Sequence, residues 1–129
     1  MNFEQARFNM IEQQLRPGKV LDPDVLDTLS MVKREEFVPP AHRRLAFADT
    51  QIPLGGAARM FAPIVEALAL QALAMKKHEH VLEVGTVAEA RLKAGAGIAD
   101  ICVAEAGLPD GSGITLIREL RAAGWVRGL

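Results

Sequence analysis

The chain of 129 residues lacks most features that assign a protein to a special class. Its single cysteine, Cys102, cannot form an internal disulfide, and neither that thiol nor the three histidines have the spacing of metal ligands. The longest apolar stretch, residues 62–75, is interrupted by Glu66 and Gln71, which predicts no membrane span. The N-terminal residues lack the basic start and apolar middle of a secretion signal, so we expect a cytoplasmic protein.

A strong charge of either sign is also missing. The net charge of -1 and the pI near 6.3 argue against nucleic acid or an anionic membrane as a partner. Apolar residues make up 50% of the chain and charged residues 24%, which is typical of a globular protein. There are no repeats and no low-complexity segments, and a mass of 14.0 kDa suits one ordinary domain.

Two helices are predicted at the start of an N-terminal segment that we assign to residues 1–78. Asn2, followed three residues later by a glutamine, resembles a capping box that starts a helix over residues 3–15. The Asp-Pro pair at residues 22–23 starts a second helix, which ends near residues 37–40 because consecutive prolines forbid continuation. The predicted apolar faces contain Phe3, Ala6, Phe8, Met10, Ile11 and Leu15 in the first helix and Val25, Leu26, Leu29, Met31 and Val32 in the second.

Residues 41–62 are irregular by pattern. They predict a short helical turn at residues 42–44 and an extended piece over 45–54, which could add a strand to a sheet, before two glycines. Pro63 then opens a third helix that runs to about Met75. This helix has apolar residues on more than one face, so we expect it to be mostly buried.

Residues 79–129 predict a truncated α/β segment. The predicted elements are a strand over residues 80–84, a helix over 87–93 with a glycine stop at 95–97, a strand over 98–104, a turn over 108–113 and a helix ending at Gly124. The fold class is therefore α/β, with a helical N-terminal extension followed by an incomplete doubly wound parallel sheet. Such sheets normally have five or more strands, so an uncovered edge could pair two copies as a homo-oligomer.

The turn after the first of these strands has the most informative local sequence, VLEVGT at residues 81–86. An apolar strand that ends in an acid and a glycine is how nucleotide-type cofactor sites begin. Glu83 could contact a ligand or be a solvated strand end. Glu105, twenty residues after Gly85, lies at the offset where an acid meets a ribose hydroxyl, although it could equally cap an exposed strand end.

The Leu-Pro-Asp-Gly turn at residues 108–111 is predicted to be structural. We expect Gly111 or Gly113 to supply a positive φ, and Asp110 or Ser112 to bond the local backbone.

Motifs over the first two thirds of the chain resemble those of one enzyme family. They are MIEQQLRP at residues 10–17, VKREEFVP at 32–39, ADTQIPLG at 48–55 and VLEVGT at 81–86, in that order. Residues 1 to about 86 thus resemble the protein-L-isoaspartate O-methyltransferase family, especially a bacterial branch of it. The resemblance implies a Rossmann-like methyltransferase sheet, the cofactor S-adenosyl-L-methionine and a protein or peptide substrate bearing isoaspartate. It implies that Glu83, Gly85 and Thr86 contact the cofactor, and the twenty-residue spacing after Gly85 adds Glu105 as a candidate for the ribose hydroxyls.

The chain departs from this family at two places. The Gly-Ser-Gly turn that usually follows the first glycine is replaced from Val87 onward, so we predict weak or no cofactor binding. Where many members have a serine that helps to hold the substrate, residues 59–61 are Arg-Met-Phe. We therefore expect impaired or absent activity, and no catalytic residue is predicted.

A second resemblance begins near residue 88. The stretch ADICVAEAGLPDGSG at residues 99–113, followed by IRELRAAG at 117–124, resembles part of a response-regulator receiver domain, with Glu105 at the position of the phosphorylated aspartate. The alternative functions are therefore a non-enzymatic receiver-like signalling or interaction module over residues 88–128, or an artificial or frameshifted fusion.

Overall fold

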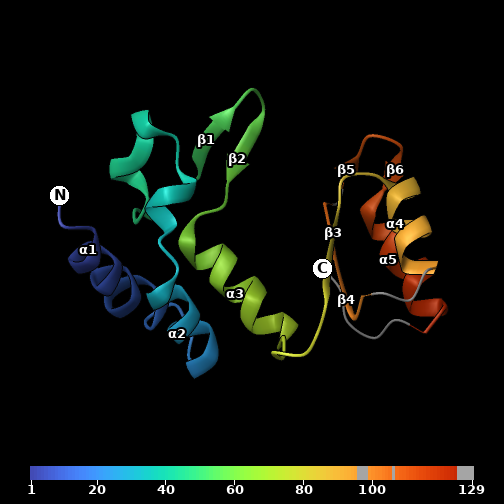
Figure 1. Ribbon diagram of the computed structural model, residues 1–129, viewed down its shortest axis with the longest axis horizontal. Coiled ribbons are helices and arrows are strands. Elements are labelled where there is room, and N and C mark those ends of the chain that lie inside the picture. Colours follow the sequence, from blue (N-terminus) through green and yellow to red (C-terminus); the bar gives the residue numbers. More distant parts are fainter. Residues whose placement is uncertain (96–98, 106, 125–129) are drawn as a thin grey trace. The chain divides into compact units, whose positions relative to one another are not determined.

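The computed structural model describes residues 1–95, 99–105 and 107–124 and divides into two compact units, Met1–Ala72 and Leu73–Leu129 (Figure 1). Each unit has its own cluster of buried apolar side chains. Among the described residues, no helix combines the length and the hydrophobicity needed to cross a membrane.

The first helix begins where the capping signal predicts. In α1 (Phe3–Met10), the side-chain oxygen of Asn2 accepts the N–H of Gln5 at 3.1 Å. The helix continues as a π-helical turn, η1 (Ile11–Leu15), so the predicted helix over residues 3–15 is confirmed. The placement of Phe8 on the apolar face is wrong, because its side chain is 58% exposed and lies outside the buried stripe.

The second helix is shorter than the sequence predicts. α2 (Pro23–Met31) is capped by Asp22, which accepts the N–H of Asp24 at 2.9 Å, but it ends at Met31 rather than near residue 37. Val32 has extended backbone angles, and a 3-10 turn, η2 (Arg34–Phe37), follows. Met31 is 73% exposed, so its predicted place on the apolar face is also wrong.

The irregular stretch contains a turn and a hairpin. η3 (Pro40–Leu45) confirms the predicted short helical turn. β1 (Ile52–Gly55) pairs antiparallel with β2 (Ala58–Met60), an element that the sequence reading missed. The extended piece over residues 45–54, which could have added a strand to the parallel sheet, instead contributes β1 to a separate two-stranded hairpin.

α3 (Pro63–Leu73) confirms the third helix but not its degree of burial. Ala67 is fully buried, whereas Val65 and Leu68 are 50% and 40% exposed. The core of this unit lies between the helices and the hairpin, and its buried side chains are Met10, Ile11, Leu15, Val20, Leu26, Val38, Ala46, Phe47, Ile52 and Ala67.

The second unit is built on one parallel strand pair. β3 (Val81–Val84) pairs with β4 (Ile101–Ala104) in the register Val81 with Ile101 to Val84 with Ala104, and α4 (Val87–Gly95) connects them. A short hairpin, β5 (Gly107–Leu108) with β6 (Gly111–Ser112), leads into α5 (Gly113–Ala122). The predicted α/β order is confirmed; residues 96–98, part of the predicted glycine stop and strand start, lie outside the described residues.

One face of the strand pair is covered by the two helices of this unit (Figure 1). Leu82 and Val84 alternate with exposed positions along β3, as expected for a strand with one buried face. The cluster on the covered face contains Leu82, Val84, Val87, Ala90, Cys102 and Leu116.

Candidate functional site

The candidate site lies at the carboxyl edge of the β3–β4 pair. Because the two strands are parallel, both end at this edge, where α/β sheets of this class bind their ligands. The start of α4 and the β5–β6 hairpin lie at the same end of the pair (Figure 1). The residues that could contact a ligand therefore come from the β3–α4 turn, the end of β4 and the hairpin.

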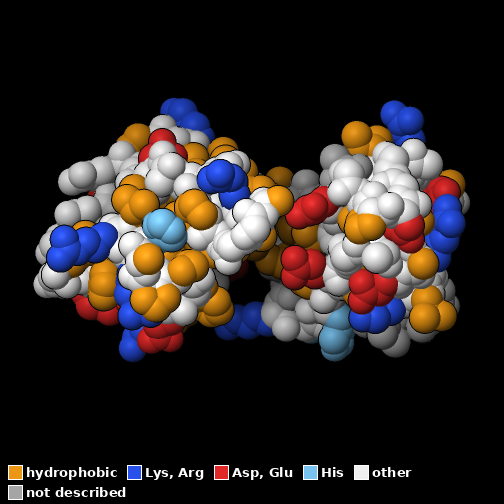
Figure 2. Space-filling model, turned by 90° about the horizontal axis from the view of Figure 1, so that it is seen from above, with side chains coloured by type: hydrophobic (Ala, Val, Ile, Leu, Met, Phe, Trp, Pro, Cys, Tyr) orange, Lys and Arg blue, Asp and Glu red, His pale blue; other side chains and the backbone are white. Residues whose placement is uncertain are grey.

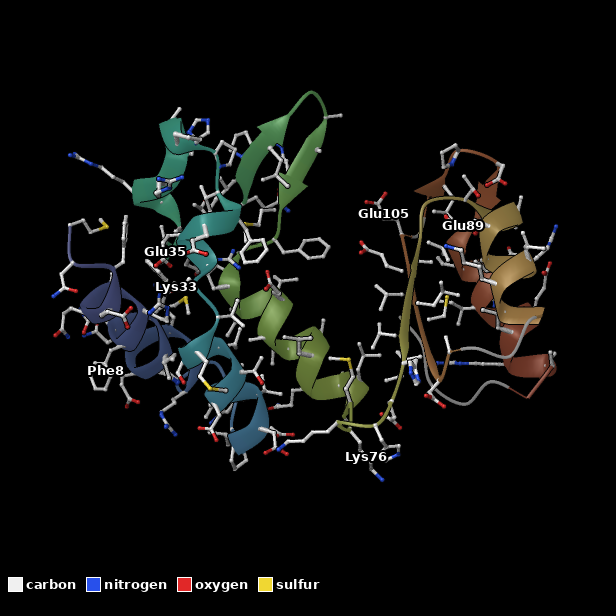
Figure 3. The ribbon with its side chains drawn as sticks, in the orientation of Figure 1. Phe8, Lys33, Glu35, Lys76, Glu89 and Glu105 are labelled. Atoms are coloured by element: carbon white, nitrogen blue, oxygen red, sulfur yellow. The ribbon has the colours of Figure 1, made fainter. Side chains whose placement is uncertain are left out.

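The two predicted carboxylates, Glu83 and Glu105, are both exposed. Glu83 alternates with the buried Leu82 and Val84, so its side chain leaves the face opposite α4 and α5. Glu105 directly follows β4, and Figure 3 shows it at the end of the strand pair on the side away from α4. Both side chains are thus free to meet solvent, and their contact with a cofactor stays a prediction.

The β3–α4 turn is closed by its own side chains. The N–H of Gly85 donates to Glu89 Oε2 at 3.1 Å, and Thr86 Oγ1 accepts the N–H of Glu89 at 3.0 Å, so Thr86 caps α4. The second oxygen of Glu89 accepts a hydrogen bond from Lys93 at 2.8 Å. The bond from Lys93 and then that from Gly85 hold the pKa of Glu89 below its ordinary value. Two of the predicted cofactor residues, Gly85 and Thr86, are thus already engaged in hydrogen bonds at the start of α4.

Asp110 also binds this helix start. Its Oδ1 accepts the N–H of Val87 at 2.7 Å and its Oδ2 accepts that of Ala88 at 3.0 Å, and these backbone bonds lower the pKa of Asp110. Of the two residues expected to bond local backbone, Ser112 does so, since its Oγ accepts the N–H of Thr115 at 3.3 Å, whereas the partners of Asp110 precede it by 23 and 22 residues. Gly111 and Gly113 are not among the glycines with positive φ in the described part of the chain, which corrects that expectation as well.

The carboxyl edge is acidic. Glu83, Glu89, Glu105 and Asp110 all belong to it, and Figure 2 shows acidic side chains spread over this face of the right-hand unit. Among the described residues, no three of histidine, cysteine, aspartate and glutamate are grouped to hold a metal ion.

The turn does not fit the cofactor that the resemblance implies. An adenosyl cofactor needs main chain that the ligand can approach closely at the glycine turn. Here the amides of Gly85, Val87 and Ala88 already donate to carboxylates of the chain itself. Engagement by a cofactor would require these bonds to break, so we derive no reaction step through it.

The motifs of the N-terminal unit place polar side chains in its interior. Arg34, from the second motif, is 6% exposed and donates to the carbonyl oxygens of Ala46 at 2.7 Å and Phe61 at 2.6 Å and to Glu66 at 2.8 Å. The guanidinium of Arg34 thereby connects η2 to the end of η3, to α3 and to the segment that follows β2. The sequence reading missed this role, because the partners of Arg34 lie 12 to 32 residues away.

Two further motif residues are also structural. Gln14, from the first motif, donates to the carbonyl of Phe47 at 2.8 Å, and Glu35, from the second, pairs with Arg7. Gln71 of α3 accepts the N–H groups of Leu21 and Asp22 and so fixes the start of α2. Residues of these motifs therefore form hydrogen bonds and ion pairs that stabilise the N-terminal unit.

The segment that replaces the substrate-side serine is open to solvent. The side chain of Phe61 is 54% exposed, while its carbonyl is one of the acceptors of Arg34. An aromatic ring is therefore exposed at that surface. A separate open depression of about 540 Å³ in this unit is lined by residues of both charges, among them Glu4, Lys33 and Arg43.

A family model described as protein-L-isoaspartate(D-aspartate) O-methyltransferase matches residues 5–124 of the chain. The match includes residues 88–124 of the receiver-like stretch. It covers the N-terminal unit and the β3–α4–β4 unit in one alignment.

Individual relatives have the same printed name. A protein-L-isoaspartate O-methyltransferase from Aeropyrum pernix is 36% identical over 109 residues, covering 84% of this chain and 39% of the relative. Protein-L-isoaspartate O-methyltransferase 2 from Anaeromyxobacter sp. is 41% identical over 83 residues, covering 64% of this chain and 34% of the relative. The matched part of the chain thus spans a third to two fifths of these relatives' length.

Proposed function

Because this chain belongs to the protein-L-isoaspartate(D-aspartate) O-methyltransferase family, we propose that it acts in the methylation of isoaspartyl carboxylates in damaged proteins. The methyl donor of this reaction is S-adenosyl-L-methionine, and the substrate is a protein or peptide bearing isoaspartate. The chain supplies the N-terminal unit and the first strand–helix–strand unit of the family's fold.

One observation carries this proposal. The β3–α4–β4 unit has the parallel register and the acid and glycine at the strand end that open a cofactor site in this class of sheet, within a chain that matches the family over residues 5–124. Glu83 and Glu105 leave the carboxyl edge as exposed carboxylates, which suits hydrogen bonds to the hydroxyls of a ribose.

The chain by itself transfers methyl groups slowly or not at all. The amides at the start of α4 are engaged within the chain, and Phe61 stands where the substrate-side hydroxyl is expected. Both departures weaken the reaction without changing its class, because the family match spans both units of the chain.

The test compares two peptides that differ only in one linkage, isoaspartyl or normal aspartyl. Each is incubated with the chain and methyl-labelled S-adenosylmethionine, and the labelled methanol released from the ester is counted. We expect transfer confined to the isoaspartyl peptide, at least about 1000-fold slower than with the relative from Aeropyrum pernix. A binding titration with both peptides accompanies it. The absence of any preference for the isoaspartyl peptide in both assays contradicts the proposal.

The receiver-like alternative has its own test. If residues 88–128 formed a phosphorylation switch, beryllofluoride with magnesium would shift the amide signals around Glu105. We expect no change, because the family match includes residues 88–124 of this stretch and Glu105 stands where a receiver domain has the aspartate that accepts the phosphoryl group. A saturable shift would support the signalling function over the methyltransferase one.

A further inference from the structure

We propose that the β5–β6 hairpin is a built-in plug of the β3–α4 turn, in which Asp110 occupies the end of α4 that would otherwise face a ligand. This inference rests on the proposed function, since it concerns how the candidate cofactor turn of that family is regulated in this chain. It assigns to Asp110 the role of an internal competitor of an adenosyl ligand.

The hydrogen bonds at the start of α4 carry the proposal. The first amides of a helix have no partner within the helix and normally bind a capping group, water or a ligand. Here Val87 and Ala88 donate to the two oxygens of Asp110, while the N–H groups of Glu89 and Ala90 donate to Thr86 Oγ1 and the Thr86 carbonyl, at 3.0 and 3.2 Å. The bond from Ala90 is the ordinary first bond of the helix. Asp110 and Thr86 Oγ1 therefore bind the three amides of α4 that have no partner in the helix itself, those of Val87, Ala88 and Glu89.

Apolar packing also holds the β5–β6 hairpin against the start of α4, in addition to the hydrogen bonds of the Asp110 carboxylate. A Cβ at Gly111 would lie 3.1 Å from Val87 Cγ2, so the hairpin backbone approaches the first residue of α4 about as closely as a glycine allows. Leu108, from the other strand of the hairpin, packs against the cluster that contains Val87. The plug is thus held by its backbone and by Leu108 as well as by the carboxylate.

The chemistry of Asp110 suits this role. A carboxylate at a helix N-terminus is favoured by the positive end of the helix dipole, as the carboxylate of an amino-acid ligand would be. Because Asp110 belongs to the same chain, its effective concentration at the turn is of the order of millimolar or higher, and a free ligand has to compete with it. The neighbouring Glu89, bonded to Gly85, also forms an ion pair with Lys93, so its charge is partly compensated and the competition rests on Asp110.

The experiment uses the full chain and three variants. Asp110→Ala removes both acceptors, and Asp110→Asn keeps the shape and one acceptor. Ser112→Ala is the matched control, since Ser112 Oγ accepts the N–H of Thr115 at 3.3 Å and so caps α5 in the same unit. The binding probe is S-adenosylhomocysteine, titrated calorimetrically, and amide hydrogen exchange is followed by NMR.

Asp110→Ala is expected to speed exchange of the Val87 and Ala88 amides at least about tenfold, with a smaller effect for Asp110→Asn and none for Ser112→Ala. S-adenosylhomocysteine is expected to bind the Asp110→Ala variant at least about tenfold more tightly than the unaltered chain, a gain that Ser112→Ala does not give.

Unchanged amide exchange at Val87 and Ala88 in Asp110→Ala would contradict the proposed plug. Equal affinity of the unaltered chain and both Asp110 variants for S-adenosylhomocysteine would also contradict it. If Asp110→Ala fails to fold, Asp110→Asn gives the same comparison with the charge removed. The exchange readout does not depend on methyl transfer. A gain in ligand affinity without any preference for isoaspartyl peptide would therefore support the plug and contradict the proposed reaction.

Discussion

Arg7 and Glu35 form an ion pair in the interior of the N-terminal unit, in which one nitrogen, Arg7 Nη2, lies 2.7 Å from each carboxylate oxygen of Glu35. The two side chains are only 3% and 9% exposed. The guanidinium also lies 5.5 Å from the ring centre of Phe47, and Glu4 approaches it from the surface. This pair connects α1 to η2 across 28 residues of sequence.

Glu35→Gln is expected to destabilise the N-terminal unit by about 3 kcal/mol, because the buried charge of Arg7 then keeps only the exposed carboxylate of Glu4 as a charged partner. The matched control is Glu12→Gln, which breaks the exposed pair between Glu12 and Arg16 and should cost less than about 0.5 kcal/mol. Urea unfolding followed by NMR signals of α1 measures both. Equal losses in the two variants would contradict this prediction.

The Arg7–Glu35 pair also predicts that the N-terminal unit loses stability at acid pH. Burial alone would raise the pKa of Glu35, but the hydrogen bonds and charge of Arg7, with help from Lys33, bring it below its ordinary value. A carboxyl group whose pKa is lower in the folded state than in the unfolded state stabilises the folded protein. This stabilisation is fully present above the unfolded pKa, about 4.3, and is lost as the pH falls through the folded-state pKa.

The difference in unfolding free energy between the unaltered chain and Glu35→Gln should therefore shrink as the pH falls below about 4.3. Urea titrations at neutral pH and at several acid values measure this difference. A difference that stays constant down to about pH 3 would show that ionisation of Glu35 does not contribute to stability.

Arg34→Lys should destabilise the N-terminal unit by about 2 kcal/mol or more. A lysine ammonium cannot reproduce the planar set of donors that reaches two carbonyls and Glu66, so buried acceptors lose their partner. Arg44→Lys, at an exposed position, is the control and should change the unfolding midpoint little. Retention of full stability by Arg34→Lys would refute this role.

The two glycines of the β1–β2 hairpin should resist substitution by alanine because of their backbone conformation. Gly55 has φ +115° and Gly56 φ +55°, and a Cβ at either would meet nothing within 4 Å. Any cost of alanine therefore comes from the backbone. Gly56→Ala should cost about 1 kcal/mol, because φ +55° lies in the left-handed region, and Gly55→Ala should cost more because φ +115° does not. Thermal unfolding of the two variants ranks them, and the reverse order would contradict the assignment.

Cys102 should be unreactive in the folded chain. Its side chain is 1% exposed, and burial raises the pKa of its thiol. Reaction with a chromogenic disulfide reagent is expected to be at least about 100-fold slower in buffer than in denaturant. Equal rates would mean that the core of the C-terminal unit opens readily.

Local sequence signals were sufficient for several elements. Asn2 and the Asp-Pro pair at residues 22–23 start helices because a cap or a proline acts on the next few residues of its own chain. The apolar runs at residues 81–84 and 101–104 gave the two strands, and the helix between them fixed their parallel direction. The acid and glycine of the β3–α4 turn predict a ligand site at the carboxyl edge of the sheet, and this stays a prediction.

Tertiary structure alone decided where α2 ends, which strand pairs with β1 and what Asp110 binds. The helical periodicity before the prolines gave no sign that Arg34 would leave the helix to reach acceptors 12 to 32 residues away. Nor did the turn at Asp110 show that its carboxylate would bind the start of a helix more than 20 residues earlier. Capping and periodicity act between neighbours and can be recognised in the sequence, whereas a buried guanidinium or a competing carboxylate meets its partners only once the chain has folded.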